Sequence, residues 1–152
     1  MKNLNFSFEK TGILEEVSLN TAYAGAKSEE EKPIFDRVAT CDSDEVLLLK
    51  FWREMYGMIT DRLRSFILSS DFSDAAFSIT LELSGAYDDS LTPSVKNDLY
   101  AAIVAGITSR WFAFVCPAKA VEWKTESERL FDSVVSKLCH RRRPVRCIAN
   151  PL

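Results

Sequence analysis

The sequence predicts a mainly α-helical protein in which a bundle of three principal helices is combined with a small β element. Two observations lead to this prediction. Apolar residues recur every three or four positions within residues 42–67, 92–115 and 117–142, which is the periodicity of amphipathic helices. Two shorter segments, near the N-terminus and at residues 77–83, instead alternate apolar and polar residues, as strands with one buried face do.

The length and composition of the chain are those of one globular domain. Its 152 residues include 47% hydrophobic and 27% charged residues, so the chain can bury a sizeable core. We divide the single domain 1–152 into three parts. Residues 1–40 are expected to form strands and loops, residues 42–140 a helical core with an inserted strand, and residues 141–152 a basic C-terminal tail.

The N-terminal segment begins with strand-like alternation. Leu4, Phe6 and Phe8 fall on one side of an extended chain. The sequence EKTG follows and could turn the chain back into a second short strand near residues 13–19. The consecutive glutamates at 29–31 could bind a metal or a basic partner, but a solvated loop is the simpler interpretation of such a charge run.

The first long helix is expected to begin in the segment CDSDEV. Asp42 can cap this helix, and Glu45, three residues later, completes the pattern of a capping box. Residues with helical spacing follow: Leu48, Trp52, Met55, Tyr56, Ile59, Leu63, Phe66 and Ile67. This aromatic and apolar stripe could line a ligand pocket, but we interpret it as the face that packs into the core.

Residues 77–83, with the sequence FSITLEL, are expected to form a strand. Phe77, Ile79 and Leu81 point to the same side of it. A single strand is not stable, so it should pair with the N-terminal strands or with another subunit. Because an unpaired strand edge in a soluble protein needs cover, we predict that Phe77, Ile79 and Leu81 take part in a partner contact.

The remaining two helices are delimited by prolines. The second helix is expected to begin with Thr92 as its cap and Pro93 in its first position. Pro117 is expected to open the third helix, and Pro144 to end it at or just after Arg142.

The three apolar stripes are expected to meet in one core. Trp52, Trp111 and Leu130 each lie on a different stripe, and we predict that all three are buried together. Cys139 is expected to be the last core position of the third helix.

The residues that catalysis or cofactor binding would need are missing. The chain has no glycine-rich phosphate loop and a single histidine, His140, so we expect no enzymatic activity and no cofactor. Cys139, His140 and Cys147 could hold zinc, but the usual close ligand pairs are missing, and we predict no metal site. Asp88 and Asp89 could bind a cation, but a turn with solvated acids is the simpler interpretation.

The cysteines and the hydropathy pattern indicate an intracellular, soluble protein. The four cysteines, at positions 41, 116, 139 and 147, form no C-x-x-C pair, and we expect them to be reduced thiols. The N-terminus lacks the apolar stretch of a signal peptide. The longest apolar runs, AAIVAGI and WFAFVC, are shorter than a membrane span.

The strongest local feature is the basic sequence CHRRRPVR near the C-terminus. The formal net charge is −3, and subtracting the four positive charges of Arg141, Arg142, Arg143 and Arg146 leaves −7 for the rest. Arginines in a last helical turn can complement the helix dipole, but that effect fades within one turn. We therefore predict that these four arginines contact an acidic partner surface or a phosphate backbone.

The order of these segments resembles the small head–tail connector proteins, also called adaptor or head-completion proteins, of tailed bacteriophages in the form carried by prophages. The resemblance spans roughly residues 42–146 and rests on LLKFWREMYGMITDRLRSFI, FSITLEL, LTPSVKNDLYAAIVAGITSRWFAF and LCHRRRPVR. Within these segments the sequences GITSRWF and RRRPVR are the most similar.

The resemblance implies a non-catalytic protein that assembles as a homo-oligomeric ring beneath the portal of a capsid and receives the tail. Its partners would be the portal and tail-proximal proteins, with non-specific contact to DNA possible and no membrane contact. It would occupy the bacterial cytoplasm during assembly and the virion neck afterwards. The alternative from the residues is a small regulatory or nucleic-acid-binding module that uses the basic C-terminal tail.

Overall fold

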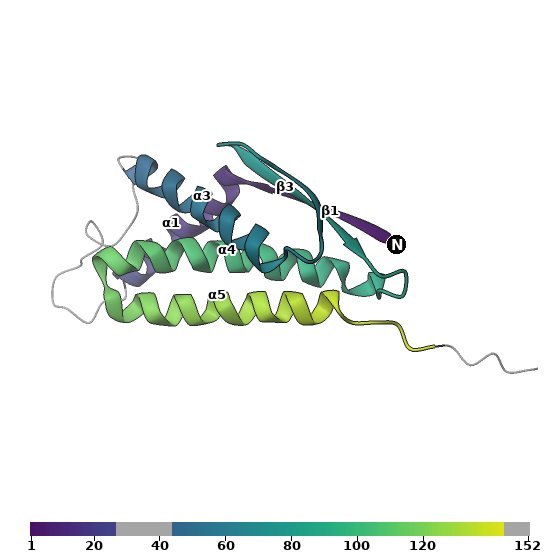
Figure 1. Cartoon of the computed structure of the whole chain (residues 1–152). Coiled ribbons are helices and arrows are strands. Elements are labelled where there is room, and N and C mark those ends of the chain that lie inside the picture. Colours follow the sequence, from purple (N-terminus) through teal and green to yellow (C-terminus); the bar gives the residue numbers. More distant parts are fainter. Residues whose placement is uncertain (27–43, 145–152) are drawn as a thin grey trace, which may run out of the picture.

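The computed structural model describes residues 1–26 and 44–144 (Figure 1). This part of the chain is mainly helical, with a small antiparallel sheet, so the predicted fold class is confirmed at that level. It contains four α-helices where the sequence predicted three. The elements are β1 (Lys2–Glu9), α1 (Lys10–Ala26), α3 (Glu45–Arg62), β2 (Ile67–Phe72), β3 (Ala76–Leu83), the short 3-10 helix η2 (Asp89–Leu91), α4 (Thr92–Val115) and α5 (Pro117–Leu138).

The sheet has the strand order β1-β3-β2, and both pairings are antiparallel. The predicted pairing of residues 77–83 with the N-terminal strand is confirmed, since Phe6 lies opposite Ile79 and Phe8 opposite Phe77. Alternation places the large apolar side chains of β1 and β3 on one face. That face packs on α3, where the Trp52 and Phe77 ring centroids are 4.8 Å apart.

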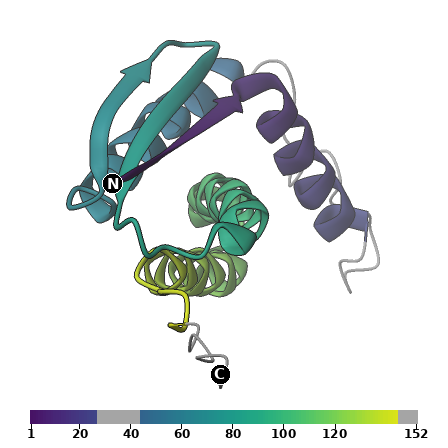
Figure 2. The same cartoon turned by 90° about the vertical axis from the view of Figure 1, so that its right-hand side faces the viewer.

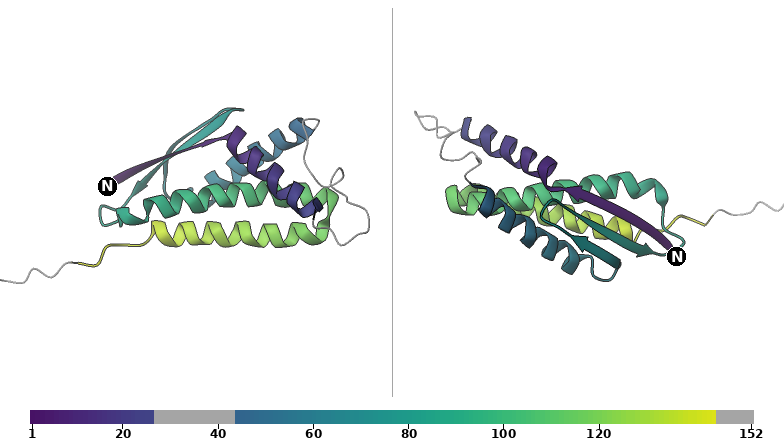
Figure 3. Two further views of the ribbon diagram at one scale, coloured as in Figure 1. Left: turned by 180° about the vertical axis from the view of Figure 1, so that it is seen from behind. Right: turned by 90° about the horizontal axis from the view of Figure 1, so that it is seen from above.

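The second N-terminal strand that we expected near residues 13–19 is absent, because these residues belong to α1. Ile13, Val17 and Thr21 are buried and are spaced four residues apart, so they form one stripe on a helix. Leu19, which a strand interpretation would have placed inside, is exposed. Figure 3 shows α1 lying across α4 near the end at which α4 turns into α5.

The first long helix is shorter than its apolar stripe indicates. α3 ends at Arg62, and Ile67 already pairs with Leu81 as the first residue of β2. The helical spacing of apolar residues therefore extends by coincidence beyond the end of α3. It continues into residues whose backbone forms hydrogen bonds with β3 and not with a further helical turn. Asp42, the predicted cap, lies outside the described residues, and the helix begins at Glu45.

α4 and α5 form a helical hairpin joined at Cys116 (Figure 1). α4 begins at Thr92 with Pro93 in its first turn, and α5 begins at Pro117, so both predicted starts are confirmed to within one residue. Viewed along the hairpin, α4 lies at the centre, with α5 on one side and α1, α3 and the sheet on the other (Figure 2).

The predicted core is confirmed. Trp52, Trp111 and Leu130 are 0%, 7% and 8% exposed and belong to one apolar cluster. α4 contributes the most to this cluster, because every residue from 102 to 109 is buried. Of the helices described, the segment Asp89–Val115 is long and apolar enough to cross a membrane, but its most apolar window is mostly buried inside the fold, as in a central core helix.

Candidate functional site

The basic C-terminal segment begins beyond the end of its helix. α5 ends at Leu138 and not at or after Arg142 as we predicted, and the basic residue of its last turn is Lys137. Arg141, Arg142 and Arg143 therefore lie outside the last turn, where a helix dipole acts weakly. Figure 1 shows the segment leaving the helical hairpin at the end opposite to the turn between α4 and α5.

Residues 141 and 142 are attached to the loop that precedes α4. Tyr87 and Arg141 form an isolated antiparallel bridge, and the backbone N–H of Arg142 donates a hydrogen bond of 2.8 Å to the carbonyl oxygen of Ala86. Tyr87 is buried, so the loop gives this bridge a fixed support. α5 ends earlier than predicted because residues that pair with this loop cannot also continue the helix.

Asp88 and Asp89, which we call the acidic turn, face the basic side chains of both ends of the described chain. Arg142 Nε is 3.8 Å from Asp88 Oδ1, and Arg142 Nη2 is 3.7 Å from Asp89 Oδ2. Lys2 Nζ is 2.6 Å from Asp89 Oδ2. Hydrogen bonds from Ser90, and then the charge of Arg142, hold the pKa of Asp88 below its ordinary value of 3.8. The two carboxylates thus lie in a turn, as we expected, but they have side-chain cations as partners and are not merely solvated.

The other members of the predicted basic site have a different environment. Arg141 and Arg143 are exposed, and no ion pair to either side chain occurs in the part of the chain that the structure describes. Arg146 lies outside the described residues.

Two further expectations concerned possible metal ligands. Cys139 is exposed and caps α5, so our prediction that it is a core residue is wrong. Leu138 is the last buried position of α5. Cys147, the third proposed zinc ligand, and the glutamates at 29–31 lie outside the described residues. Within residues 1–26 and 44–144, no three histidine, cysteine or acidic side chains lie together as a metal site would require.

The residues predicted for a strand-mediated contact lie in the core. Phe77, Ile79 and Leu81 are at most 2% exposed. Both neighbours of β3 are present, so this strand has no free edge. The prediction failed because the sequence assigned residues 67–72 partly to a helix, whereas they form the strand β2 that covers the second edge. The edges of the described sheet belong to β1 and β2.

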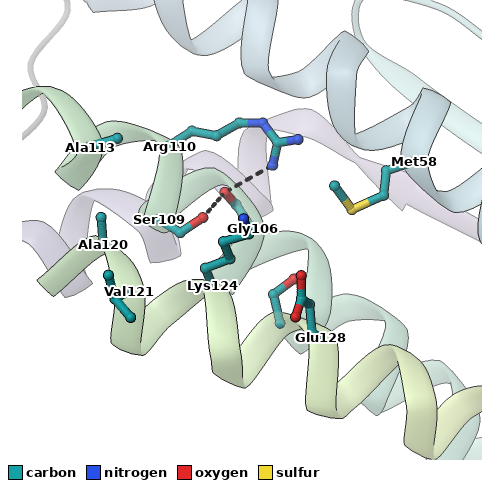
Figure 4. A pocket seen from close by; sticks show the side chains of 10 residues that line it. Met58, Gly106, Ser109, Arg110, Ala113, Ala120, Val121, Lys124 and Glu128 are labelled. Carbon is teal, nitrogen blue, oxygen red and sulfur yellow. Dashed lines mark hydrogen bonds between the residues drawn. The ribbon is translucent and has the colours of Figure 1, made fainter. Parts of the chain in front are cut away.

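A groove of about 390 Å³ between α3, α4 and α5 was not predicted from the sequence (Figure 4). Small residues line part of it, among them Gly106 and Ser109 on α4 and Ala120 on α5. Arg110 reaches over it, donating to the carbonyl oxygen of Gly106 at 3.3 Å and to Glu54 at 2.9 Å. The cluster of small residues in AAIVAGITS was the signal available in the sequence.

The hydroxyl groups that line this groove have structural partners. Ser109 Oγ donates to the Gly106 carbonyl oxygen at 2.8 Å, and Ser127 Oγ donates to the Ala102 carbonyl oxygen at 2.9 Å. The first bond lies within α4, and the second joins α5 to α4 where the two helices approach closely. The groove is therefore a product of helix packing, and the basic segment is the stronger candidate for a functional site.

The chemistry that the basic segment can perform is the binding of anions. Guanidinium groups pair with carboxylates and phosphates through parallel hydrogen bonds.

Comparison of this chain with models of protein families, with curated proteins and with solved structures finds no match.

Proposed function

We propose that this chain is a structural assembly protein, a ring-forming connector that joins the portal of a tailed phage to its tail. The observation that supports this best is the exposed basic segment at one end of the fold, in which Arg141 and Arg143 have no ion pair among the described residues. The sequence resemblance over residues 42–146 supplies the biological setting.

The partner that suits this segment is an acidic protein surface. Arginine forks pair bidentately with carboxylates, which gives such contacts a defined geometry. The chain outside its four C-terminal arginines has a formal charge of −7, obtained from the net charge of −3. A second copy of the chain therefore offers acidic surface, and a contact between two different faces of identical subunits can close into a ring.

The setting implied by the resemblance completes the proposal. The ring would form in the bacterial cytoplasm, bind the portal and the tail-proximal proteins, and remain in the virion neck. No catalytic step is part of this function.

A nucleic-acid-binding module is the second candidate. The exposure of three consecutive arginines favours it, because guanidinium groups also bind phosphates. Aromatic side chains that would stack on bases do not alternate with these arginines in the sequence.

Assembly with the portal tests the first proposal. In the test variant, four residues are changed to glutamine: Arg141, Arg142, Arg143 and Arg146. In the control variant, which has the same change in charge, four basic residues elsewhere are changed to glutamine: Lys10, Arg64, Lys96 and Lys124. Light scattering after size exclusion and electron microscopy of each protein mixed with its portal measure ring formation.

We expect the control variant to assemble and the test variant to remain a folded, unassembled subunit. Normal assembly of the test variant, together with weaker binding of duplex DNA and a smaller salt dependence, would contradict the connector proposal and favour the nucleic-acid-binding module.

A further inference from the structure

The three described arginines of the basic segment do not have equal environments. Arg142 faces the acidic turn, with its guanidinium nitrogens 3.7 and 3.8 Å from the two carboxylates. Arg141 and Arg143 have no such partner in the described chain. Arg141 forms a bridge with Tyr87, and the Arg142 N–H bonds to the Ala86 carbonyl oxygen. Successive side chains at such a bridge point to opposite sides, so Arg141 does not share the side of Arg142.

We infer that Arg142 is a positioning residue, which fastens the basic segment to the acidic turn, and that Arg141 and Arg143 form the pair that contacts an acidic partner. This inference rests on the proposed function for the chemistry of the partner. It goes further because it assigns separate roles to neighbouring arginines and names the residues that hold them.

Contacts that do not involve Arg142 stabilise the conformation of the acidic turn. Asp88 Oδ1 accepts hydrogen bonds from the Ser90 backbone N–H at 3.1 Å and from Ser90 Oγ at 2.8 Å. Lys2 Nζ donates to the carbonyl oxygen of Tyr87 at 3.1 Å and to Asp89 at 2.6 Å. The turn is thus tied to η2 on one side and to β1 on the other.

The backbone of the segment is fastened at the same place. The Arg142 N–H bonds to the Ala86 carbonyl oxygen, and Arg141 forms a bridge with the buried Tyr87. Each contact alone is small, since an exposed ion pair contributes little. Together they restrict the backbone of the basic segment and the side chain of Arg142. This restriction lowers the conformational entropy that would be lost when a partner binds.

This arrangement defines the kind of partner that fits. Residues two positions apart are separated by at most roughly 7 Å along a chain, which is also the spacing of acidic residues at alternate positions of an extended segment. The pair of Arg141 and Arg143 therefore suits an extended acidic segment of a protein, with carboxylates at every second residue.

Fluorescence polarisation with a labelled peptide of alternating glutamate and serine, eight residues long, tests the inference at low ionic strength. One variant, R141Q/R143Q, removes the contact pair. A second, D88N/D89N, removes the charges of the acidic turn but leaves every arginine in place, and asparagine still caps η2. The control for the second variant is E122Q/E128Q, in which two exposed acids of α5 undergo the same change in charge.

We expect R141Q/R143Q to bind the peptide about tenfold more weakly or worse, with unchanged hydrogen-exchange protection of the Arg142 amide. We expect D88N/D89N to bind it about three- to fivefold more weakly than E122Q/E128Q does. The Arg142 amide should also lose protection in D88N/D89N and keep it in the control.

Three results would overturn the inference. Tighter peptide binding by D88N/D89N than by E122Q/E128Q would mean that the acidic turn competes with the partner. Unchanged binding by R141Q/R143Q would mean that these arginines are not the contact pair. A wild-type protein that binds a duplex of about 20 base pairs and not the peptide would replace the acidic partner with nucleic acid. Failure of the proposed function is recognised separately, as peptide binding without ring formation on the portal.

Discussion

Gly106 of α4 faces Met55 of α3 and Ser127 of α5, and its replacement by alanine tests the packing of the helical core. An ideal Cβ atom at this position would lie 2.5 Å from Met55 Sδ and 3.3 Å from Ser127 Oγ. Met55 is itself fully buried, so its side chain cannot move away into solvent. Overfilling a packed core costs about 1–3 kcal/mol, whereas alanine gains about 1 kcal/mol over glycine in a helix. We therefore expect Gly106→Ala to lower the free energy of unfolding by up to about 2 kcal/mol.

Gly57→Ala is the matched control for this substitution. Gly57 lies within α3, and nothing comes within 4 Å of a Cβ atom placed there. This substitution should raise the free energy of unfolding by about 0.5–1 kcal/mol. Denaturant unfolding followed by the fluorescence of the buried Trp52 and Trp111 measures both variants. A Gly106→Ala protein as stable as Gly57→Ala would refute the argument from close packing.

A double-mutant cycle tests whether the Met55 side chain causes the loss of stability in Gly106→Ala. If Met55 is the obstacle, Gly106→Ala should be less destabilising in a Met55→Ala background, with a coupling free energy of about 1 kcal/mol or more. Additive effects of the two substitutions would show that the strain lies elsewhere.

Three further predictions concern the core, the helical hairpin and the acidic turn. Trp111→Ala should lower the free energy of unfolding by about 3–5 kcal/mol in denaturant titrations, because the ring is buried; a loss below about 1 kcal/mol would contradict its place in the core. Asp98→Ala removes the carboxylate that lies 2.5 Å from Lys137 Nζ and should cost about 1–3 kcal/mol, less in a Lys137→Met background. The pKa of Asp88 is lowered mainly by hydrogen bonds from Ser90, so its charged form stabilises the turn above pH 3.8, and this contribution is lost as the pH falls through the lowered pKa. The protection factor of the Ser90 amide should therefore fall on acidification below the ordinary pKa of 3.8, and a constant value would contradict this cause.

The parts of the fold that could be predicted from the sequence are those with strong local signals. Proline fixes its own backbone angle and lacks an N–H, so Pro93 and Pro117 marked the starts of α4 and α5 without any knowledge of the tertiary structure. Strict alternation likewise identified β1 and β3. Trp52 and Trp111 could be assigned to the core because large apolar residues on a helical stripe have few other stable positions.

The parts that failed were segments whose patterns suited two structures. Residues 13–19 are compatible with a short strand, but the burial of Ile13 and Val17 together with the exposure of Leu19 fits a helix that packs on α4. Ile67 continued the helical stripe of α3, but it pairs with Leu81 in the sheet. In both cases contacts with distant elements decided the structure, and a local period carries no information about such contacts.

The charge of the candidate site likewise depends on a contact between segments that are distant in the sequence. In the sequence, Asp88 and Asp89 are two solvated acids, and the C-terminal arginines are a uniform cluster. The structure brings Arg142 to the acidic turn although residues 90–141 lie between them in the sequence. The charge of this arginine and the charges of the two carboxylates therefore partly neutralise one another. Counting arginines in the sequence therefore overstates the charge that faces a partner. Arg142 faces the two carboxylates, and the guanidinium groups of its neighbours Arg141 and Arg143 are exposed. The acidic turn therefore determines the basic surface as much as the arginines themselves do.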